Sequence, residues 1–518
     1  MSSKYDFAAY FDFTGGQNSE AAPDNLRDDE MRSITNFDII LRGALKGRAG
    51  TTATNWGFTA SPATMRIDRL VEYPRITGEL QYLVLSGGVL YKKGSLTPII
   101  SGVGVHLDYT VYQDKCYILL NNKYYVYDGT ILAEVAKVGV ADNNLTEIAK
   151  CKYITAKGEK IYAAGNPDSP TALYYSQVGD PSYFKTGDFR VFANSGDGDA
   201  ISGLHEYQST LLVFKAKGLW KYEGVSAAVD AQFTKLSADT GTRAYRTIQN
   251  IGNFVFFLGS DGVYAIKTTQ TGVVITEKVS GSISDAFVGV TYPALWHEAS
   301  AVAGIYKGKY IIAYSRDKEN PMINTDIYVC HTDIGLARNV TPWTKYAGIG
   351  ISAMLVSVAG DLYMGSDALQ EIFSFDSTNL TDRGARINYS LASKDYELNS
   401  PIHLKKIKRG WLIFRQYEAF ESNVSMNLVV DYDNKSVGVV YNSEGSTGLS
   451  ASESLIWDKG LYGVHRWGWI DTVTLPFRIG SKGIRIRIEM GAYSDSTFLN
   501  EIFIYGFAFM YKSKKPYK

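Results

Sequence analysis

The amino-acid sequence predicts an all-β protein, a β-propeller of about seven blades (six to eight) with an irregular N-terminal arm and a C-terminal β-sandwich. Three observations support this fold class: a hairpin motif that recurs at near-regular spacing, a composition rich in tyrosine and poor in proline, and a change of strand pattern near residue 385. We expect the arm to span residues 1–60, the propeller 61–384, and the sandwich with a basic tail 385–518.

The hairpin motif is an apolar run, a tight turn and a second run that ends near an aromatic residue. Phe254–Leu258, for example, precedes Asp261 and Gly262, a pair that supplies the positive φ of a tight hairpin. The spacings between successive motifs are 34, 49, 46, 44, 64 and 45, close to the ~40–50 residues of a four-stranded blade. A single hairpin cannot hide its apolar face, so radial stacking of blades is needed to close the core. The closing aromatics are Tyr91, Tyr125, Tyr174, Trp220, Tyr264, Tyr328 and Phe373.

The longest interval, between Tyr264 and Tyr328, contains the polar stretch 316–324 with Pro321, which predicts a long loop inside one hairpin. The chain of 518 residues should form more than one domain. An irregular β-sandwich, or several sandwiches, is the alternative to the propeller.

Charge and cysteine content narrow the classes of function. Lys plus Arg and Asp plus Glu both number 53, so no global field favours nucleic acid or a membrane. No window approaches the ~20 apolar residues of a membrane span, and no signal segment is evident at residues 1–10, so we expect no membrane insertion. Cys116, Cys151 and Cys330 read as reduced, buried thiols of a protein made in a cytoplasm.

The two ends of the chain differ from the repeat region. Residues 483–489 alternate isoleucine with charged residues, which is typical of a half-buried antiparallel strand and predicts the sandwich. Residues 1–60 show no regular apolar period. We therefore expect that residues 1–50 could be deleted without unfolding the protein, and that the arm serves subunit contacts.

Several segments resemble propeller proteins of bacteriophage tails, the tail hub or nozzle proteins of short-tailed phages, including the packaged-DNA stabilisation type. Residues 46–51 keep Arg48 and Gly50 of the basic segment that follows the arm in that family, but they lack its proline. The segments that carry the resemblance are Phe11–Asn18, Pro23–Asn25, Asn36–Asp38, Gly43–Leu45, Ala172–Phe184, Gly241–Tyr264 and Phe507–Lys515.

This resemblance implies a structural virion protein, made in the host bacterial cytoplasm, that forms a ring of identical subunits, commonly six. The ring would lie below the portal and adaptor and surround the channel through which double-stranded DNA is retained and later ejected, without sequence-specific contacts. Two alternatives remain: a receptor-binding or baseplate propeller at the tail tip, and, less favoured, a propeller enzyme acting on glycans. The enzyme would need a cluster of acids and arginines in its central funnel.

A search for catalytic, cofactor-binding or metal-binding motifs predicts none. Ser260–Gly262 has the wrong spacing for a sialidase repeat, and Gly304, Gly308 and Lys309 lack the Ser or Thr of a phosphate loop. His297 and Glu298 could begin a zinc motif, but Ala301 occupies the second histidine position.

Two pairs of acids have a spacing that could help to hold Ca²⁺, Asp197 with Asp199 and Asp431 with Asp433. Neither pair has the terminal Glu of a calcium loop, so ordinary turn chemistry is favoured.

The dense positive runs lie in the sandwich and at the chain end. They could contact phosphates or the acidic faces of neighbouring proteins, but solvated strand ends are favoured, because a conduit must let DNA slide. These residues are Lys405, Lys406, Lys408, Arg409, Lys512, Lys514, Lys515 and Lys518.

Overall fold

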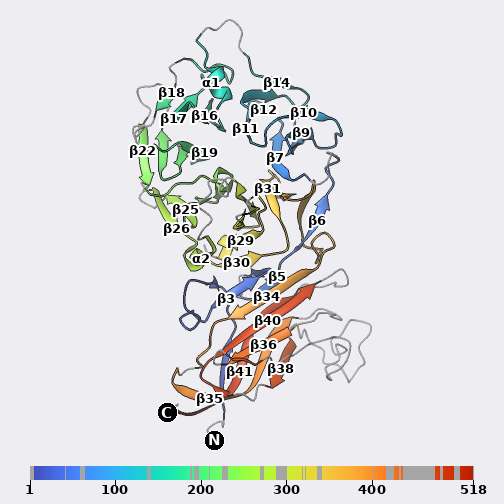
Figure 1. Ribbon diagram of the computed structural model, residues 1–518, viewed down its shortest axis with the longest axis vertical. Coiled ribbons are helices and arrows are strands. Elements are labelled where there is room, and N and C mark those ends of the chain that lie inside the picture. Colours follow the sequence, from blue (N-terminus) through green and yellow to red (C-terminus); the bar gives the residue numbers. More distant parts are fainter. Residues whose placement is uncertain are drawn as a thin grey trace.

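The computed structural model shows a propeller with a β-sandwich attached to its rim, and both chain ends lie at the far end of the sandwich (Figure 1). The structure describes residues 5–40, 43–58, 65–136, 142–186, 189–191, 198–208, 210–223, 232–237, 239–268, 274–287, 300–317, 319–320, 322–334, 341–398, 401–415, 425–430, 433–435, 473–478, 482–494 and 502–516.

The propeller has seven four-stranded antiparallel blades among these residues, which confirms the predicted fold class. In blades 1 to 6 the four strands follow one another along the chain, and first strands of most neighbouring blades contact each other around the centre. Blade 1 consists of β7 (Ile67–Pro74), β8 (Leu80–Ser86), β9 (Val89–Lys92) and β10 (Pro98–Ser101). Blade 2 consists of β11 (Leu107–Tyr112), β12 (Lys115–Leu120), β13 (Lys123–Tyr127) and β14 (Leu132–Glu134). Blade 3 consists of β15 (Tyr153–Lys157), β16 (Lys160–Asn166), β17 (Ser169–Tyr175) and β18 (Phe189–Val191).

Blade 7 closes the ring with a strand from the start of the chain. Its first three strands come from residues 351–376, and its outermost strand is β6, which pairs antiparallel with β33. Blade 4 consists of β19 (Ile201–Tyr207), β20 (Thr210–Lys215), β21 (Leu219–Glu223) and β22 (Gln232–Ser237), and blade 5 of β23 (Gln249–Ile251), β24 (Phe254–Leu258), β25 (Val263–Thr268) and β26 (Val274–Lys278). Blade 6 consists of β27 (Val302–Tyr306), β28 (Lys309–Tyr314), β29 (Asp326–Cys330) and β30 (Trp343–Tyr346). Blade 7 consists of β31 (Ile351–Val356), β32 (Leu362–Ser366), β33 (Ile372–Asp376) and β6 (Gly50–Thr54).

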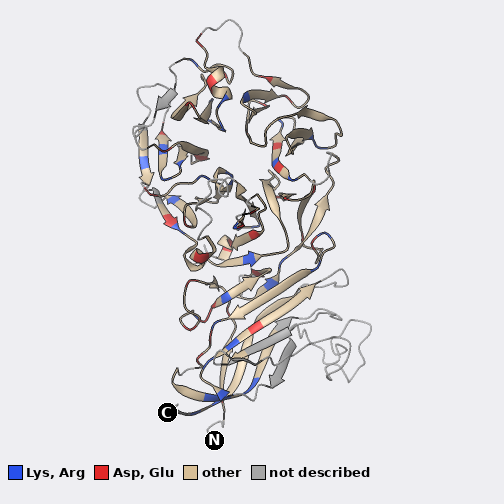
Figure 2. Cartoon of the chain, viewed as in Figure 1, with Lys and Arg blue, Asp and Glu red and all other residues tan. Residues whose placement is uncertain are grey.

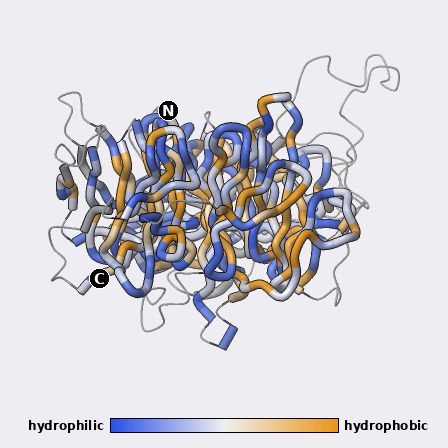
Figure 3. The backbone as a smooth tube through the Cα atoms, turned by 90° about the horizontal axis from the view of Figure 1, so that it is seen from above, coloured by the Kyte–Doolittle hydropathy of each residue, from blue (hydrophilic) through white to orange (hydrophobic). Residues whose placement is uncertain are grey.

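The repeated aromatics mark one structural position. Each lies on the third strand of its blade, and all are buried except Tyr264, which is partly exposed. The predicted tight turns are present too: Asn121 and Asn122, with φ of 54° and 55°, join β12 to β13, as a type I′ hairpin requires. Figure 3 shows hydrophobic residues along the strands and hydrophilic ones gathered in many of the turns.

The predicted loop in the longest interval is confirmed, since β28 ends at Tyr314 and β29 begins at Asp326; Pro321 itself lies outside the described residues. The loop explains only part of the extra length. The connection from blade 5 to blade 6 adds the short helices η3 (Gly281–Ile283) and α2 (Ser284–Phe287). Elsewhere, α1 (Leu145–Ala149) precedes blade 3 and η2 (Tyr245–Thr247) precedes blade 5.

The sandwich consists of two sheets whose apolar faces share one core. Phe507 and Phe509 from the first sheet and Ile486 and Ile488 from the second lie in the same buried cluster. The first sheet contains β38 (Val473–Arg478), β35 (His403–Arg415), β41 (Phe503–Pro516), β5 (Leu45–Gly47) and β4 (Phe37–Ile39), with β1 (Asp6–Tyr10) on β41 and β39 (Lys482–Gly483) on β35. The second contains β3 (Glu30–Thr35), β34 (Ile387–Ser393), β40 (Ile486–Ser494), β36 (Ser425–Val430) and β37 (Asp433–Lys435), with β2 (Gly16–Gln17) on β3.

The second sheet continues directly from the propeller, because β3 pairs parallel with β30, the outer strand of blade 6. The predicted alternation over residues 483–489 is seen from Ile486 onward, where isoleucines are buried and Arg487 and Glu489 are partly exposed. Ile484 precedes that strand, in the short connection from β39 to β40.

Residues 1–60 differ from the extended arm that we expected. The described residues among them form no sheet of their own, but β1, β4 and β5 join the first sandwich sheet, β2 and β3 join the second, and β6 joins blade 7. These strands are short and most of their partners are distant in the sequence, so no local period reveals them. Phe13, Met31, Ile34 and Phe37 are fully buried, which argues against the expectation that residues 1–50 could be deleted without unfolding the protein.

Candidate functional site

Two regions collect polar side chains: the propeller axis and the junction between propeller and sandwich. The axis is crossed by the connection from blade 4 to blade 5. At η2, Arg246 Nη1 donates to the carbonyl of Asp68 in blade 1 at 3.1 Å, and the Tyr245 hydroxyl reaches the carbonyl of Leu107 in blade 2 at 3.5 Å. Since η2 also contacts β19, β24 and β27, side chains from this connection occupy the centre of the ring.

The axis contains acids, arginines and aromatic rings close together. Arg69 Nη2 lies 3.4 Å from Asp108 Oδ1, and its guanidinium lies 5.8 Å from the ring centroid of Tyr245. Tyr153 meets Tyr245 edge-on at 4.9 Å, and His106 lies 5.7 Å from Tyr245. This is the kind of cluster that a glycan-acting propeller would need.

The electrostatics of the axis follow from desolvation. Burial raises the pKa of Asp108 to about 6, against the opposing effect of Arg69. His106 is still reached by solvent, but desolvation by the protein packed around it lowers its pKa to about 4. Its Nε2 lies 2.8 Å from the Lys152 carbonyl, so the neutral ring donates from Nε2. For Arg246, burial lowers the pKa to about 10.

The carboxylates of the axis already have structural partners. Asp108 Oδ2 accepts from Ile154 N of blade 3 at 2.9 Å, so Asp108 links blades 1 and 3 through its own blade. Asp68 accepts from Arg66 Nε at 2.7 Å and from Gly87 N at 2.9 Å. The chemistry that the axis offers is therefore hydrogen bonding between blades.

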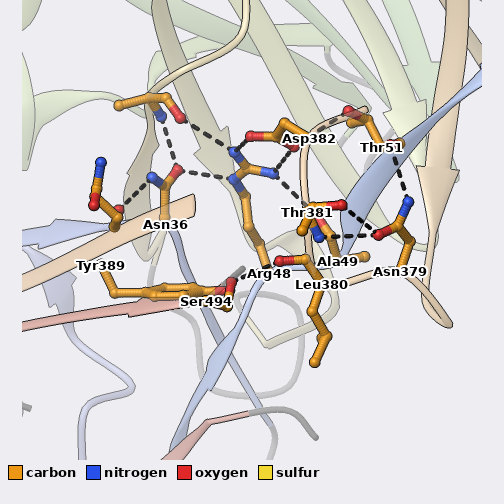
Figure 4. A network of polar contacts seen from close by, with 12 residues as sticks. Asn36, Arg48, Ala49, Thr51, Asn379, Leu380, Thr381, Asp382, Tyr389 and Ser494 are labelled. Carbon is orange, nitrogen blue, oxygen red and sulfur yellow. Dashed lines mark hydrogen bonds and ion pairs between the residues drawn. The ribbon is translucent and has the colours of Figure 1, made fainter. Parts of the chain in front are cut away.

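The junction is organised by Arg48, whose side chain is fully buried (Figure 4). Its guanidinium donates to Asp382 from Nη1 at 2.9 Å and from Nη2 at 2.5 Å, and Asp382 lies between blade 7 and β34. Arg48 Nε donates to Asn36 Oδ1 at 2.8 Å, and the remaining hydrogens reach the carbonyls of Ala49 and Ala347. Burial alone would lower the pKa of Arg48, but Asp382 raises it above its usual value.

Asn36 completes this network on the sandwich side. With φ of 62° it adopts a left-handed conformation that asparagine tolerates better than most residues. Its side chain donates to the carbonyl of Asn388 in β34 at 2.7 Å and accepts from Ala347 N at 2.8 Å. One asparagine therefore connects the arm, blade 6 and the sandwich.

A second polar group at the junction surrounds Asp38. Its carboxylate lies 2.6 Å from Lys309 Nζ and accepts from the Tyr346 hydroxyl. Burial would raise the pKa of Asp38, but the Lys309 charge lowers it below its usual value. His331 nearby is fully buried, its Nε2 lies 3.0 Å from Thr344 Oγ1, and burial lowers its pKa to about 3.

The other segments of the resemblance form turns and connections. Asp180 accepts from Ser182 N at 3.0 Å and from its hydroxyl at 2.6 Å, which holds the Gly-Asp-Pro turn after β17. Asp12 accepts from Thr14 in the same manner. The segment from Gly241 to Tyr264 is the connection that fills the axis, followed by the first hairpin of blade 5.

The two pairs of acids whose spacing could help to hold Ca²⁺ are only partly described. Asp197 and Asp431 lie outside the described residues. Asp199 Oδ2 accepts from Lys217 N at 2.8 Å, a contact between residues 18 apart and not a local turn, and Asp433 is paired with Val430 where β37 begins. Within the described residues, no group of three or more His, Cys, Asp or Glu is placed to hold a metal ion.

The other residues considered in the sequence are those of the incomplete zinc motif and the three cysteines. His297 and Glu298 are not described, while Ala301 is buried in the core. Cys116, Cys151 and Cys330 are buried and form no disulfide with one another. Among the helices described, none is long and apolar enough to span a membrane.

The basic runs come together in space. Lys405 is buried and donates to the carbonyl of Ile484 at 2.9 Å, whereas Lys406 lies directly opposite Lys512 on the neighbouring strand. Lys518 lies outside the described residues. Both runs are evident in the sequence, but their adjacency could not be predicted, because β36 to β40 lie between β35 and β41 in the sequence.

The arrangement as a whole defines a seven-bladed propeller joined to a two-sheet sandwich. No family model matches the chain, and no curated protein matches it. Solved structures resemble it distantly: a streptogramin B lyase (10% identity, TM-score 0.34, covering 72% of this chain and 98% of that one) and the Neurospora crassa Pan2 WD40 domain (9%, 0.34, 74% and 99%).

Another similar structure is the extracellular domain of a hybrid two-component system from B. thetaiotaomicron, at 10% identity and a TM-score of 0.41. The match covers 66% of this chain but only 44% of that domain. Similarities at these identities and TM-scores carry no argument about function.

Proposed function

We propose that the chain is a structural virion protein, one subunit of a tail hub or nozzle ring that forms the channel retaining and releasing a phage genome. The mechanism is mechanical rather than enzymatic. A rigid propeller presents loops on a fixed scaffold, and the sandwich supplies contacts to neighbouring subunits. The ring would hold six identical copies and would bind the portal-adaptor assembly and other tail proteins.

The observation that carries this proposal is the place of the arm residues on which the resemblance rests. Asn36, Asp38 and Arg48 bind blade 6, β34 and the connection from blade 7, where the propeller meets the sandwich. Gly50 begins the closing strand, and a Cβ at this position would lie 2.3 Å from the Thr381 carbonyl. The arm residues that carry the resemblance therefore connect the propeller to the sandwich. Such a connection supports the resemblance more specifically than a repeated hairpin does, because many propellers contain repeated hairpins.

The filled axis supports a conduit that would run between subunits. Tyr245 and Arg246 reach from one side of the propeller to blades 1 and 2 on the other. Since their side chains occupy the centre, a DNA duplex would pass through the opening enclosed by the ring of subunits, and no single propeller would be threaded.

A tail-tip or baseplate protein that binds a receptor is the second candidate. A glycan-acting enzyme is the third, and the cluster of Arg69, Asp108, Tyr153 and Tyr245 is the feature that favours it. The enzyme is less favoured because Asp68 and Asp108 are both held by interblade or turn hydrogen bonds.

Negative-stain imaging of the purified protein tests the proposal. A hub subunit should form closed rings with a central opening larger than the propeller axis. Trimers or monomers would favour a tail-tip protein. Hydrolysis of bacterial surface glycans that is lost in Asp108→Asn would favour the enzyme.

A further inference from the structure

We propose that the outer surface of the first sandwich sheet binds the phosphate backbone of double-stranded DNA through a set of lysines from β35, β39 and β41. We call this set the lysine face. Its members are Lys406, Lys408, Lys482, Lys512 and Lys514. This inference rests on the proposed function only in one respect, namely that the DNA would be the duplex that passes through the ring of subunits.

Strand register brings three of these lysines into one row. Lys406 on β35 lies opposite Lys482 on β39 and, on its other side, opposite Lys512 on β41. Neighbouring strands are ~4.8 Å apart, so the row places three ammonium groups across ~10 Å of sheet. Figure 2 shows Lys and Arg near both chain ends, at the end of the sandwich far from the propeller.

Alternation along the strands turns these side chains away from the core. Lys405 and Ile407 are buried, whereas Lys406 and Lys408 are partly exposed. On β41, Phe509 and Tyr511 are buried, while Lys512 and Lys514 are exposed. Because residues two apart on a strand share a face, Lys514 extends the row along β41. Lys408 is partly exposed and lies where the register between β35 and β41 shifts.

No carboxylate neutralises the lysine face among the described residues. Elsewhere in the chain, lysines at strand edges have acidic partners, such as Lys123 with Glu134 at 2.8 Å and Lys267 with Glu277 at 2.5 Å. Arg485, close to Lys482 in sequence, is paired with Asp24 and Glu397. Among the described residues, the lysine face therefore differs from Arg485, whose charge is compensated by two carboxylates.

Such a row is unfavourable unless an anion binds it, because like charges directly opposite one another on a sheet destabilise the pairing. An extended row suits a polymer that carries a charge on every repeat better than a single small anion. Lysine ammonium groups act as point charges without strict geometry. They would therefore hold phosphates regardless of base sequence, as a sliding contact requires.

Anisotropy of a labelled DNA duplex, titrated with the full-length protein across a salt series, tests this inference. Five phosphate contacts predict a slope of about −4 to −5 in log K against log salt, which is an affinity loss of roughly 500-fold between 50 and 200 mM salt. Replacing Lys406 and Lys512 with Gln should reduce the slope by about 2.

The matched control replaces Lys123 and Lys267 with Gln, which removes the same charge at two blade edges and should leave the slope unchanged. An equal loss in both double variants would overturn the inference. Tighter binding to vesicles of anionic lipid than to the duplex would also overturn it.

Ring formation is imaged for the same samples, so that the two proposals can fail separately. Rings without a lysine-dependent slope would refute the lysine face alone. A lysine-dependent slope without rings would support the lysine face and refute the proposed hub.

Discussion

Arg48 is the residue on which the connection between propeller and sandwich depends most. Its five donor hydrogens are all directed at acceptors, and its carboxylate partner Asp382 is 3% exposed. Removing one member of a buried pair leaves the other charge without compensation, and this costs more than the pair itself contributes.

We therefore expect Arg48→Met to lower the free energy of unfolding by about 3–5 kcal/mol, measured by denaturant titration. Lys123→Met, which breaks the exposed pair with Glu134, should have only a small effect, because solvent screens such a pair. Equal effects of the two substitutions would show that Arg48 is not the main connection.

The lowered pKa of His331 should make the free energy of unfolding depend on pH. Its folded pKa of about 3 lies below the ordinary value of 6.5, so the unfolded chain binds the proton more readily. The stability that the neutral ring confers is fully present above pH 6.5 and is lost as the pH falls toward 3.

Between pH 8 and pH 4.5, this one residue should remove about 2–3 kcal/mol from the free energy of unfolding. Denaturant titrations of the parent and of His331→Gln at several pH values measure the effect. The variant should show a flatter profile over this range, and parallel profiles would exclude His331 as its source.

At the scale of elements, the hairpins were predictable because each is local. The third-strand aromatics and the Asn121–Asn122 turn are visible in short windows of sequence, and the structure confirms both. The closing strand β6 was not predictable, because its partner β33 lies beyond all the strands of the first six blades in the sequence. The same kind of separation hid the junction network and the pairing of Lys406 with Lys512.

The substitution Trp220→Ala tests the assignment of β21 to a propeller blade. Trp220 on β21 is 6% exposed and packs in the cluster shared by blades 3 and 4. Emptying this site should cost about 3–5 kcal/mol, measured by denaturant titration. Tyr264→Ala should cost less, because its ring is partly exposed. A parent-like value for Trp220→Ala would contradict the assignment.

Deletion of residues 1–54 tests the role of the first strands. The deletion removes β1 to β6, including the outer strand of blade 7. We expect loss of the cooperative folded state, seen as disappearance of the near-ultraviolet circular dichroism signal. A truncated chain that stays folded and fails only to assemble would restore the simpler description of the segment as a docking arm.

At the scale of the whole molecule, the main feature is the way in which the propeller and the sandwich are connected. Blade 6 continues into the sandwich through β3, and blade 7 is closed from the start of the chain, so propeller and sandwich are connected at two places. Figure 2 shows Lys and Arg near both chain ends, at the end of the sandwich that lies far from the propeller.

The measurement that tests the central claim most directly is the mass of the purified protein in solution, determined by mass photometry over a range of concentrations. A ring of six subunits predicts one species with six times the subunit mass of 57.3 kDa, which becomes dominant as concentration rises. A single species of 57.3 kDa at every concentration would contradict the proposal that this chain forms a ring by itself.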